Sequence, residues 1–181
     1  MHISICVTSD LHGRLDRFEQ ITKEMKRLNP DLIIDNGDFL QGSLTTYYYD
    51  WVQPRPHPMV ALANKTGYDV AIFGNHEFNY PVESIEAMRN ECDFPWIAGN
   101  IGDFAQPYII KQVKGTKVAI VGVVTHFTPL WDEQQHTKSL TFTNAFSAAR
   151  YWVQYVKEME QADVVILSYH GGFTRDPETD A

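Results

Sequence analysis

The sequence predicts an α/β fold with mixed sheets, formed as one domain over residues 1–181. Short apolar runs alternate with amphipathic helical patterns through the first hundred residues, which is typical of parallel βαβ units with right-handed crossovers. From Tyr108 the pattern changes to two apolar runs around Lys114-Gly115, which indicates a β-hairpin and hence a mixed or second sheet. With 181 residues, 44% of them hydrophobic, the chain can bury a core of its own.

The first half of the chain is expected to contain strands at 3–9, 31–35 and 70–73, with helices at 16–28, near 59–66 and at 81–91. The first helix has apolar residues at helical spacing that we expect to face inward: Phe18, Ile21, Met25 and Leu28. Asn29-Pro30 ends this helix. The Tyr- and Thr-rich stretch at 45–51 has no clear period and is predicted to be irregular, with its tyrosines in local packing.

The second half is expected to contain a short strand at 94–98, the hairpin at 108–113 and 117–124, a loop at 125–139, a helix at 144–161 and a strand at 164–167. We expect the last helix to turn a set of apolar residues inward: Phe146, Ala149, Trp152, Val153, Val156 and Met159. Trp131 in the loop is assigned to packing. His2, His57 and His136 are assigned to ordinary surface or loop positions.

The composition excludes several classes of partner. A net charge of -8 argues against a broad basic surface for nucleic acid, and no apolar run reaches the length of a membrane span. Cys6 and Cys92 have no metal or redox spacing and are predicted to pack as small hydrophobes in a reducing compartment. Met1 leads directly into a strand rather than a signal sequence, which predicts a cytoplasmic protein if Met1 is the native start.

Polar side chains with metal-binding chemistry follow four of the predicted strands. Asp10 and His12 follow the first strand, Asp38 the second, Asn75-His76 the third and His170 the last. Carboxyl ends of parallel strands meet at one edge of a sheet, so these groups are expected to lie together. Carboxylates, amide oxygens and neutral imidazoles are ligands for divalent cations. Each also has a simpler interpretation: a helix cap for Asp10 with His12, an Asx turn for Asp38, a polar pair for Asn75-His76 and a structural role for His170.

The order Asp-x-His, Gly-Asp-x-x-x-Gly, Gly-Asn-His-Glu resembles the calcineurin-like metallophosphoesterase superfamily over nearly the whole chain. Asn36-Gly37-Asp38, Asn75-His76-Glu77-Phe78 and His170-Gly171-Gly172 resemble more narrowly its branch of 5′-nucleotidases and 2′,3′-cyclic-nucleotide 2′-phosphodiesterases. The resemblance implies an αββα sandwich, a small-molecule nucleotide substrate, and two divalent cations (Mn, Zn, Fe or Mg). It implies five metal ligands: Asp10, His12, Asp38, Asn75 and His170.

By the same resemblance, His76 with Asn75 beside it is catalytic near the leaving-group oxygen, and the attacking group is a metal-bridging hydroxide. Glu77, Asn79 and His126 are expected to lie near these residues or the substrate. Two features depart from the family's pattern. Asn79 stands where 5′-nucleotidases have Asp, which favours the cyclic-phosphodiesterase-like members, and no Gly-His-x-His motif occurs in the 181 residues.

The missing motif predicts that the catalytic domain is incomplete at its C-terminus and that a further C-terminal part of the family's chain completes it. We therefore expect weakened metal binding and little or no nucleotide turnover from these residues alone, unless another chain supplies the missing imidazoles. Two alternatives remain open: a phosphodiesterase acting on other diesters, and a degenerate, non-catalytic binding module.

Overall fold

The computed structural model describes residues 2–52, 57–131 and 133–172. Its strands are β1 (Ile5–Thr8), β2 (Leu32–Asp35), β3 (Val70–Ile72), β4 (Trp96–Ile97), β5 (Tyr108–Val113), β6 (Thr116–Val124) and β7 (Val164–His170). Its α-helices are α1 (Leu15–Leu28), α2 (Leu44–Tyr47), α3 (Pro58–Thr66), α4 (Val82–Glu91), α5 (Thr128–Trp131), α6 (Gln134–Thr137) and α7 (Ala145–Glu158). A π-helical turn, η1 (Tyr48–Val52), and a 3₁₀ turn, η2 (His76–Asn79), complete the elements.

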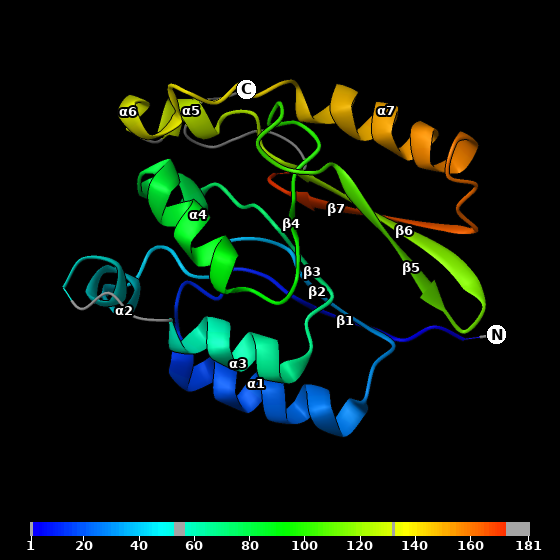
Figure 1. The fold of residues 1–181 in the computed structure, drawn as a ribbon, viewed down its shortest axis with the longest axis horizontal. Helices are drawn as coiled ribbons and strands as arrows, with labels where there is room; N and C mark the ends of the chain where they lie inside the picture. The colour runs from blue at the N-terminus through cyan, green and yellow to red at the C-terminus, as the bar shows by residue number, and fades with distance from the viewer. Residues whose placement is uncertain (1, 53–56, 132, 173–181) are drawn as a thin grey trace.

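Two sheets form the centre of the fold. Four parallel strands make the first sheet in the order β1-β2-β3-β4, and β5-β6-β7 make the second, in which β5 is antiparallel to β6 and β7 is parallel to it. Helices α1 and α3 cover the outer side of the first sheet and α7 that of the second (Figure 1). The four layers confirm the predicted αββα sandwich.

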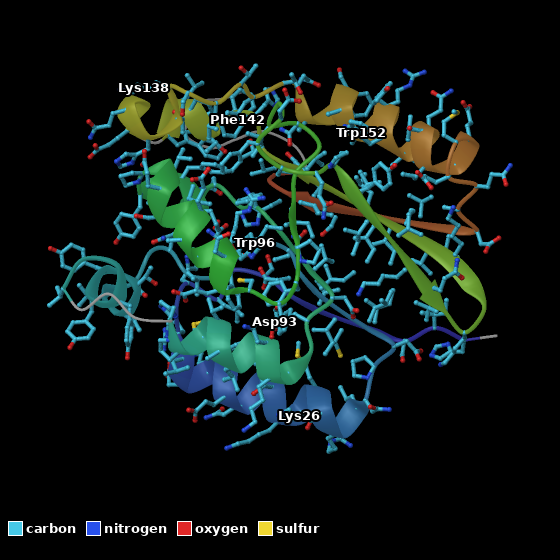
Figure 2. All side chains as sticks on the ribbon, viewed as in Figure 1. Lys26, Asp93, Trp96, Lys138, Phe142 and Trp152 are labelled. Atoms are coloured by element: carbon cyan, nitrogen blue, oxygen red, sulfur yellow. The ribbon has the colours of Figure 1, made fainter. Side chains whose placement is uncertain are left out.

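The two sheets pack face to face through branched aliphatic side chains. This inner core contains Leu32, Ile34, Val70, Ile72 and Ile97 from the first sheet and Val113, Val118 and Ile120 from the second. The outer core under the helices of the first sheet is aromatic: Phe73 packs against Trp96 with ring centroids 5.2 Å apart, and Trp96 lies in the interior (Figure 2). Both faces of β2, β3 and β4 are therefore buried, which explains their continuous apolar strands, whereas Ile5 and Val7 of the edge strand β1 are exposed.

Local capping explains where several helices begin and end. Asn29, as predicted, ends α1 in the left-handed conformation, and its N–H donates to the carbonyl of Met25. The Asn144 side chain accepts from the N–H of Ser147 at the start of α7. Ser43 caps α2 in the same way by accepting from Thr46.

Three expectations about these elements were wrong. The stretch at 45–51 is helical, in α2 and η1, rather than irregular. Phe146 and Met159 of α7 and Leu28 of α1 are exposed, because the apolar stripe of each helix is wider than the surface that the sheet or neighbouring helix covers. His57 is buried and caps α3: its Nδ1 accepts from the N–H of Met59, and burial lowers its pKa to about 4.

The predicted loop at 125–139 also contains α5 and α6. No helix among the described residues is both long enough and apolar enough to cross a lipid bilayer.

Candidate metal centre

Two loops, after β1 and β2, are joined by backbone hydrogen bonds at the carboxyl edge of the first sheet. The N–H of Asp10 donates to the carbonyl of Gly37 at 3.0 Å, and the N–H of His12 donates to the carbonyl of Asp38 at 2.9 Å. The side chains of Asp10, His12 and Asp38 therefore lie together, although Asp10 and Asp38 are 28 positions apart in the sequence.

All three residues have backbone dihedrals in the left-handed region, with φ of 57°, 48° and 56° for Asp10, His12 and Asp38. This conformation is uncommon outside glycine and costs on the order of 1–3 kcal/mol per residue. It aims three ligand-type side chains at one point. The polar geometry of this edge is therefore maintained at a cost in conformational energy, which is frequent at functional sites.

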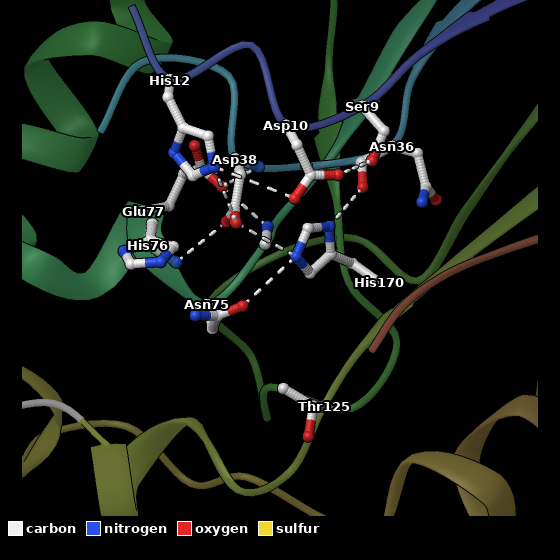
Figure 3. Close-up of polar contacts among 12 residues, drawn as sticks. Ser9, Asp10, His12, Asn36, Asp38, Asn75, His76, Glu77, Thr125 and His170 are labelled. Carbon is white, nitrogen blue, oxygen red and sulfur yellow. Dashed lines mark hydrogen bonds and ion pairs between the residues drawn. The ribbon is translucent and has the colours of Figure 1, made fainter. Parts of the chain in front are cut away.

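Asp38 is the centre of the cluster (Figure 3). Its Oδ2 lies 3.3 Å from His170 Nε2 and 3.8 Å from His12 Nε2. Its Oδ1 accepts from the backbone N–H of His76 at 2.9 Å. Asp38 is nearly fully buried, so its two oxygens have these neighbours rather than bulk water.

The two imidazoles that face Asp38 are fixed in the same tautomer. His12 Nδ1 lies 2.9 Å from the carbonyl oxygen of Gln41, and His170 Nδ1 lies 2.6 Å from that of Asn36. Because a carbonyl oxygen can only accept, each Nδ1 must donate its hydrogen. In the neutral form, both Nε2 lone pairs then point toward the carboxylate of Asp38, an arrangement that requires a cation between them.

A proton on Nε2 of His170 can supply part of the positive charge that this arrangement needs. Burial opposes protonation, but the hydrogen bond to Asp38 and the negative charge of Asp38 outweigh it and raise the pKa of His170 to about 9. For Asp38, burial is the largest single influence and acts to raise the pKa, but the hydrogen bond to His170, the positive charge of His170 and the N–H of His76 together outweigh burial and lower the pKa. Both shifts report a site that attracts positive charge.

Glu77 holds the loops around Asp38 in place. Its Oε2 accepts from the N–H of Asp38 at 2.9 Å and of Gly74 at 2.7 Å, and its Oε1 accepts from the N–H of Phe39 at 2.8 Å. The side chain is 1% exposed. Burial, and then the negative charge of Asp38, raise the pKa of Glu77. The structure thus places Glu77 behind the cluster, where it joins the loops that follow β2 and β3.

Two glycines allow this close approach. A Cβ at Gly74 would lie 2.2 Å from Asp38 Oδ1, and a Cβ at Gly37 would lie 2.6 Å from His170 Nδ1. Real Cβ atoms essentially never make such contacts. Gly37 has φ of +96° in addition. The glycines of the Gly-Asp and Gly-Asn-His-Glu motifs are therefore required by packing against the site.

His76 and Asn79 form a pair at the edge of the cluster. His76 Nδ1 and Asn79 Oδ1 are 2.7 Å apart, so Nδ1 donates its hydrogen to the amide oxygen. The imidazole of His76 also meets that of His12 edge to face, with ring centroids 5.1 Å apart. Nε2 is therefore the ring nitrogen of His76 that takes no part in the pair with Asn79.

Asn75 lies between His76 and His170 (Figure 3), with its Oδ1 3.2 Å from His170 Nε2. The cluster residues border a pocket of about 480 Å³. Its lining is Ser9, Asp10, His12, Asn36, Asp38, Asn75, His76, Trp131, Tyr169, His170, Gly171 and Gly172. Trp131 packs on Phe127, as predicted, with ring centroids 6.2 Å apart, and it also forms part of the wall of this pocket.

His126 lies away from the cluster. It does not line the pocket of the cluster but borders a neighbouring, mainly apolar pocket with Ala145 and Phe146, and the two pockets share Tyr169 and Gly172. Its ring nitrogens face Asn144 and the N–H of Ala145. The structure brings the other residues of the predicted site together and does not bring His126 to them.

Sequence reasoning assigned no role to Asp35 and Asn36, although both position the site. Asp35 is fully buried, accepts from Thr8 Oγ1 at 2.6 Å and from the N–H of Gly37 at 3.0 Å, and burial raises its pKa well above the usual range. Asn36 accepts from Ser168 Oγ at 2.5 Å and so connects the two sheets beside His170. The sequence did contain a signal for Asp35, because a carboxylate at the end of an otherwise apolar strand indicates a buried structural role.

The simpler interpretations of the ligand residues do not describe these contacts. The first turn of α1 has no side-chain cap, so Asp10 is free of that role. Asp38 bonds to a residue 38 positions away rather than only to its own turn.

The donor set suits two divalent cations. Asp10, His12 and Asp38 offer ligand atoms that all lie within 4.8 Å of one another. Asp38, Asn75 and His170 form a second group, with His170 Nε2 within 3.3 Å of an oxygen of each partner. Carboxylate, amide oxygen and imidazole ligands, with Nδ1–H donated to a backbone carbonyl, are the usual surroundings of such ions.

Comparison with known proteins agrees with this geometry. The sequence profile of the calcineurin-like phosphoesterases matches residues 3–180. The chain belongs to this family. The predicted resemblance is therefore confirmed, and divalent metal binding is typical of the family.

Two curated relatives process nucleotides. The chain is 29% identical over 212 residues to a 2′,3′-cyclic-nucleotide 2′-phosphodiesterase/3′-nucleotidase of Salmonella typhimurium, covering 97% of the chain and 32% of the relative. It is 29% identical over 192 residues to a 5′-nucleotidase of Vibrio cholerae, covering 97% and 35%. The chain thus spans about a third of the length of these relatives.

The fold matches a solved structure of the same family. The calcineurin-like phosphoesterase YfkN of Bacillus subtilis superposes with a TM-score of 0.84 at 24% identity, over 99% of this chain and 65% of that one.

Proposed function

We propose that this calcineurin-like phosphoesterase hydrolyses phosphate esters of nucleotides at the cluster around Asp38. The observation that carries the proposal is Asp38 itself, a buried carboxylate that faces the Nε2 atoms of two imidazoles, each held by a backbone carbonyl. Asp10, His12 and Asp38 would hold one cation, and Asp38, Asn75 and His170 the other. Mn, Zn, Fe and Mg all suit these ligands.

Two divalent cations, when bound, neutralise phosphoryl oxygens and lower the pKa of coordinated water. Residues of the chain hold the proposed ligands of these cations in place. Glu77 fixes the backbone of Asp38, and the carbonyls of Gln41 and Asn36 fix the two imidazoles. The site is thus organised before a substrate binds.

His76 is proposed to exchange a proton with the leaving-group oxygen. Its Nδ1–H is donated to Asn79 Oδ1, so the proton that moves is the one on Nε2, which is able to face the pocket. The amide of Asn79 orients the ring without adding negative charge. This arrangement agrees with the preference for a cyclic-phosphodiesterase-like activity drawn from Asn79.

The substrate class is proposed from the relatives. Both are named for activities on nucleotides, and the net charge of -8 disfavours a polyanionic nucleic acid. Either a 2′,3′-cyclic nucleotide or a nucleoside monophosphate satisfies these points. The completion of the metal site by a further segment, weak turnover without it, and a cytoplasmic location remain predictions.

The test is hydrolysis of bis(p-nitrophenyl) phosphate, 2′,3′-cyclic AMP and AMP, with and without added MnCl₂. We expect slow, Mn²⁺-dependent turnover that Asp38→Asn abolishes and His76→Ala lowers by a factor on the order of 100 or more, the usual size of a general-acid contribution. Turnover that is independent of metal, or equal in Asp38→Asn, would contradict the proposal. Bound metal without turnover in a chain extended by the missing C-terminal part would favour the non-catalytic alternative.

A further inference from the structure

His57 is a buried imidazole that the proposed reaction does not use. It is 3% exposed, and its hydrogen bonds select one tautomer. The backbone N–H of Met59 donates to Nδ1 at 3.2 Å, so the hydrogen of the neutral ring is on Nε2. Nε2 lies 3.3 Å from Oγ1 of Thr46, to which it can donate. Burial lowers the pKa of His57 to about 4, so the ring keeps this neutral form at neutral pH.

Thr46 connects His57 to the loop that follows β2. Its side chain is fully buried, and its hydroxyl bonds to the backbone carbonyl of Leu40. Because a carbonyl oxygen can only accept, the hydroxyl hydrogen is donated to Leu40, and Oγ1 accepts the Nε2 hydrogen of His57. The direction of every hydrogen bond from Met59 to Leu40 is therefore determined.

The same loop orients the imidazole of His12. Gln41 follows Leu40 in the sequence, and its backbone carbonyl accepts from His12 Nδ1 at 2.9 Å. Gly42 makes room for this bond, since its φ is +92° and a Cβ there would lie 2.9 Å from the same nitrogen. Thr46 thus holds the peptide group next to the one that orients the ring of His12, which lies beside Asp38 (Figure 3).

A second contact joins Thr46 to the backbone beside His12. Gly13 is the next residue after His12, and a Cβ there would lie 2.8 Å from Thr46 Oγ1 and 2.7 Å from the carbonyl oxygen of Leu40. Such contacts are essentially absent for real Cβ atoms. The backbone after His12 therefore packs directly on the hydrogen-bonded pair of Thr46 and Leu40.

We propose that Thr46 and His57 are positioning residues for His12. The inference rests on the proposed function, because it takes His12 as a metal ligand. The side chain of His12 is 32% exposed and that of His170 9%, so the ring of His12 has less packing around it and depends more on its hydrogen bond. Thr46 and His57 hold the loop, and the Gln41 carbonyl then keeps the ring hydrogen on Nδ1. This leaves Nε2 of His12 for the cation.

The test is the tautomer of His12 in the metal-free chain, measured from imidazole nitrogen chemical shifts by NMR. The chain is kept in EDTA at about pH 8.5, where an ordinary imidazole is neutral, and the His12 signals are those absent from His12→Gln. The wild type should have the hydrogen on Nδ1. Thr46→Val should show a mixture of both tautomers, and Thr46→Ser, which keeps the hydroxyl, should restore the wild-type shifts. His57→Asn can still cap α3 but is too short to reach Thr46, so it should resemble Thr46→Val.

Mn²⁺ affinity, from equilibrium dialysis, is the second measurement. Thr46→Val should weaken it by about tenfold, because partners that orient a metal ligand typically change affinity by about 10–100-fold. Thr22→Val is the matched control. Thr22 is also buried, at 3% exposed, and its hydroxyl also donates to a carbonyl, that of Glu19 at 3.1 Å within α1. Thr22→Val should change neither the His12 tautomer nor the affinity.

His12 shifts in Thr46→Val and His57→Asn equal to those of Thr22→Val would overturn the inference, and so would a wild type without the hydrogen on Nδ1. If Thr46→Val does not fold, His57→Asn decides. The tautomer is measured without metal or substrate, so it also separates this inference from the proposed function. A changed tautomer without any Mn²⁺-dependent hydrolysis by the wild type refutes the proposed function alone. Hydrolysis by the wild type, with an unchanged tautomer in both variants, refutes the positioning role alone.

Discussion

Replacing Glu77 with Gln tests whether this buried carboxylate fixes the loops around Asp38. Glu77 accepts three backbone N–H groups, from Asp38, Phe39 and Gly74, at 2.7–2.9 Å. In Glu77→Gln the amide oxygen can still accept two of them, but the amide NH₂ must face the third donor. One buried N–H without a partner costs about 1–3 kcal/mol, and the two remaining bonds lose their charge. We therefore expect unfolding free energy to fall by about 2–4 kcal/mol.

The assay is urea unfolding followed by circular dichroism in EDTA, so that stability is measured without metal. Glu19→Gln, on the exposed face of α1, is the matched control and should change stability by less than about 0.5 kcal/mol. An unfolding midpoint of Glu77→Gln equal to that of the control would refute the claim that the three bonds stabilise the loops. A change in m-value instead of midpoint would mean that the native or unfolded ensemble had changed.

Three further predictions concern stability around the site. In EDTA, the free energy of unfolding should decrease as pH rises from about 6.5 to about 9, because the pKa of His170 in the folded chain lies above its ordinary value of 6.5 and protonated His170 pairs with Asp38. Urea unfolding midpoints across this range measure the decrease. An equal decrease with pH in His170→Gln would contradict the assignment to His170. Gly74→Ala should cost about 1–3 kcal/mol from overpacking and abolish Mn²⁺ binding in a titration, whereas Gly172→Ala, whose Cβ meets nothing within 4 Å, should keep wild-type stability. Asn100→Ala should lower the free energy of unfolding by about 2–3 kcal/mol, since this buried amide makes three hydrogen bonds to backbone groups; loss of less than about 0.5 kcal/mol in urea unfolding would refute that role.

The strands could be predicted because apolar runs are a local pattern, and the grouping of polar residues around Asp38 could be predicted because parallel topology brings strand ends together. Continuous apolar runs that end in Gly and polar residues identified the strand ends, and parallel topology then required those ends to meet. Asp38 could be placed at a strand end because it follows a short apolar run, and that run forms β2, which is entirely buried. The grouping of Asp10 with Asp38 followed from topology rather than from any contact visible in sequence.

The features that sequence reasoning missed depend on contacts between distant residues. His57 resembles any loop histidine, but its N–H donates to a carboxylate oxygen of Glu91, and its buried ring lies beside Thr46, with Nε2 3.3 Å from Thr46 Oγ1. The positive φ of His12 has no signal in sequence because His tolerates both conformations. Trp131 occupies a short helix in a stretch without hydrophobic period, so its place in the pocket wall could not be inferred.

The most direct test of the central claim is Mn²⁺ binding to the metal-free chain, measured by equilibrium dialysis and electron paramagnetic resonance. The account predicts two ions per chain at saturating Mn²⁺ with magnetic coupling between them, because both ligand groups share Asp38. Asp38→Asn should lose the coupling and bind at most one ion. Uncoupled ions in the wild type, or a coupled pair that persists in Asp38→Asn, would contradict the assignment of Asp38 to both sites.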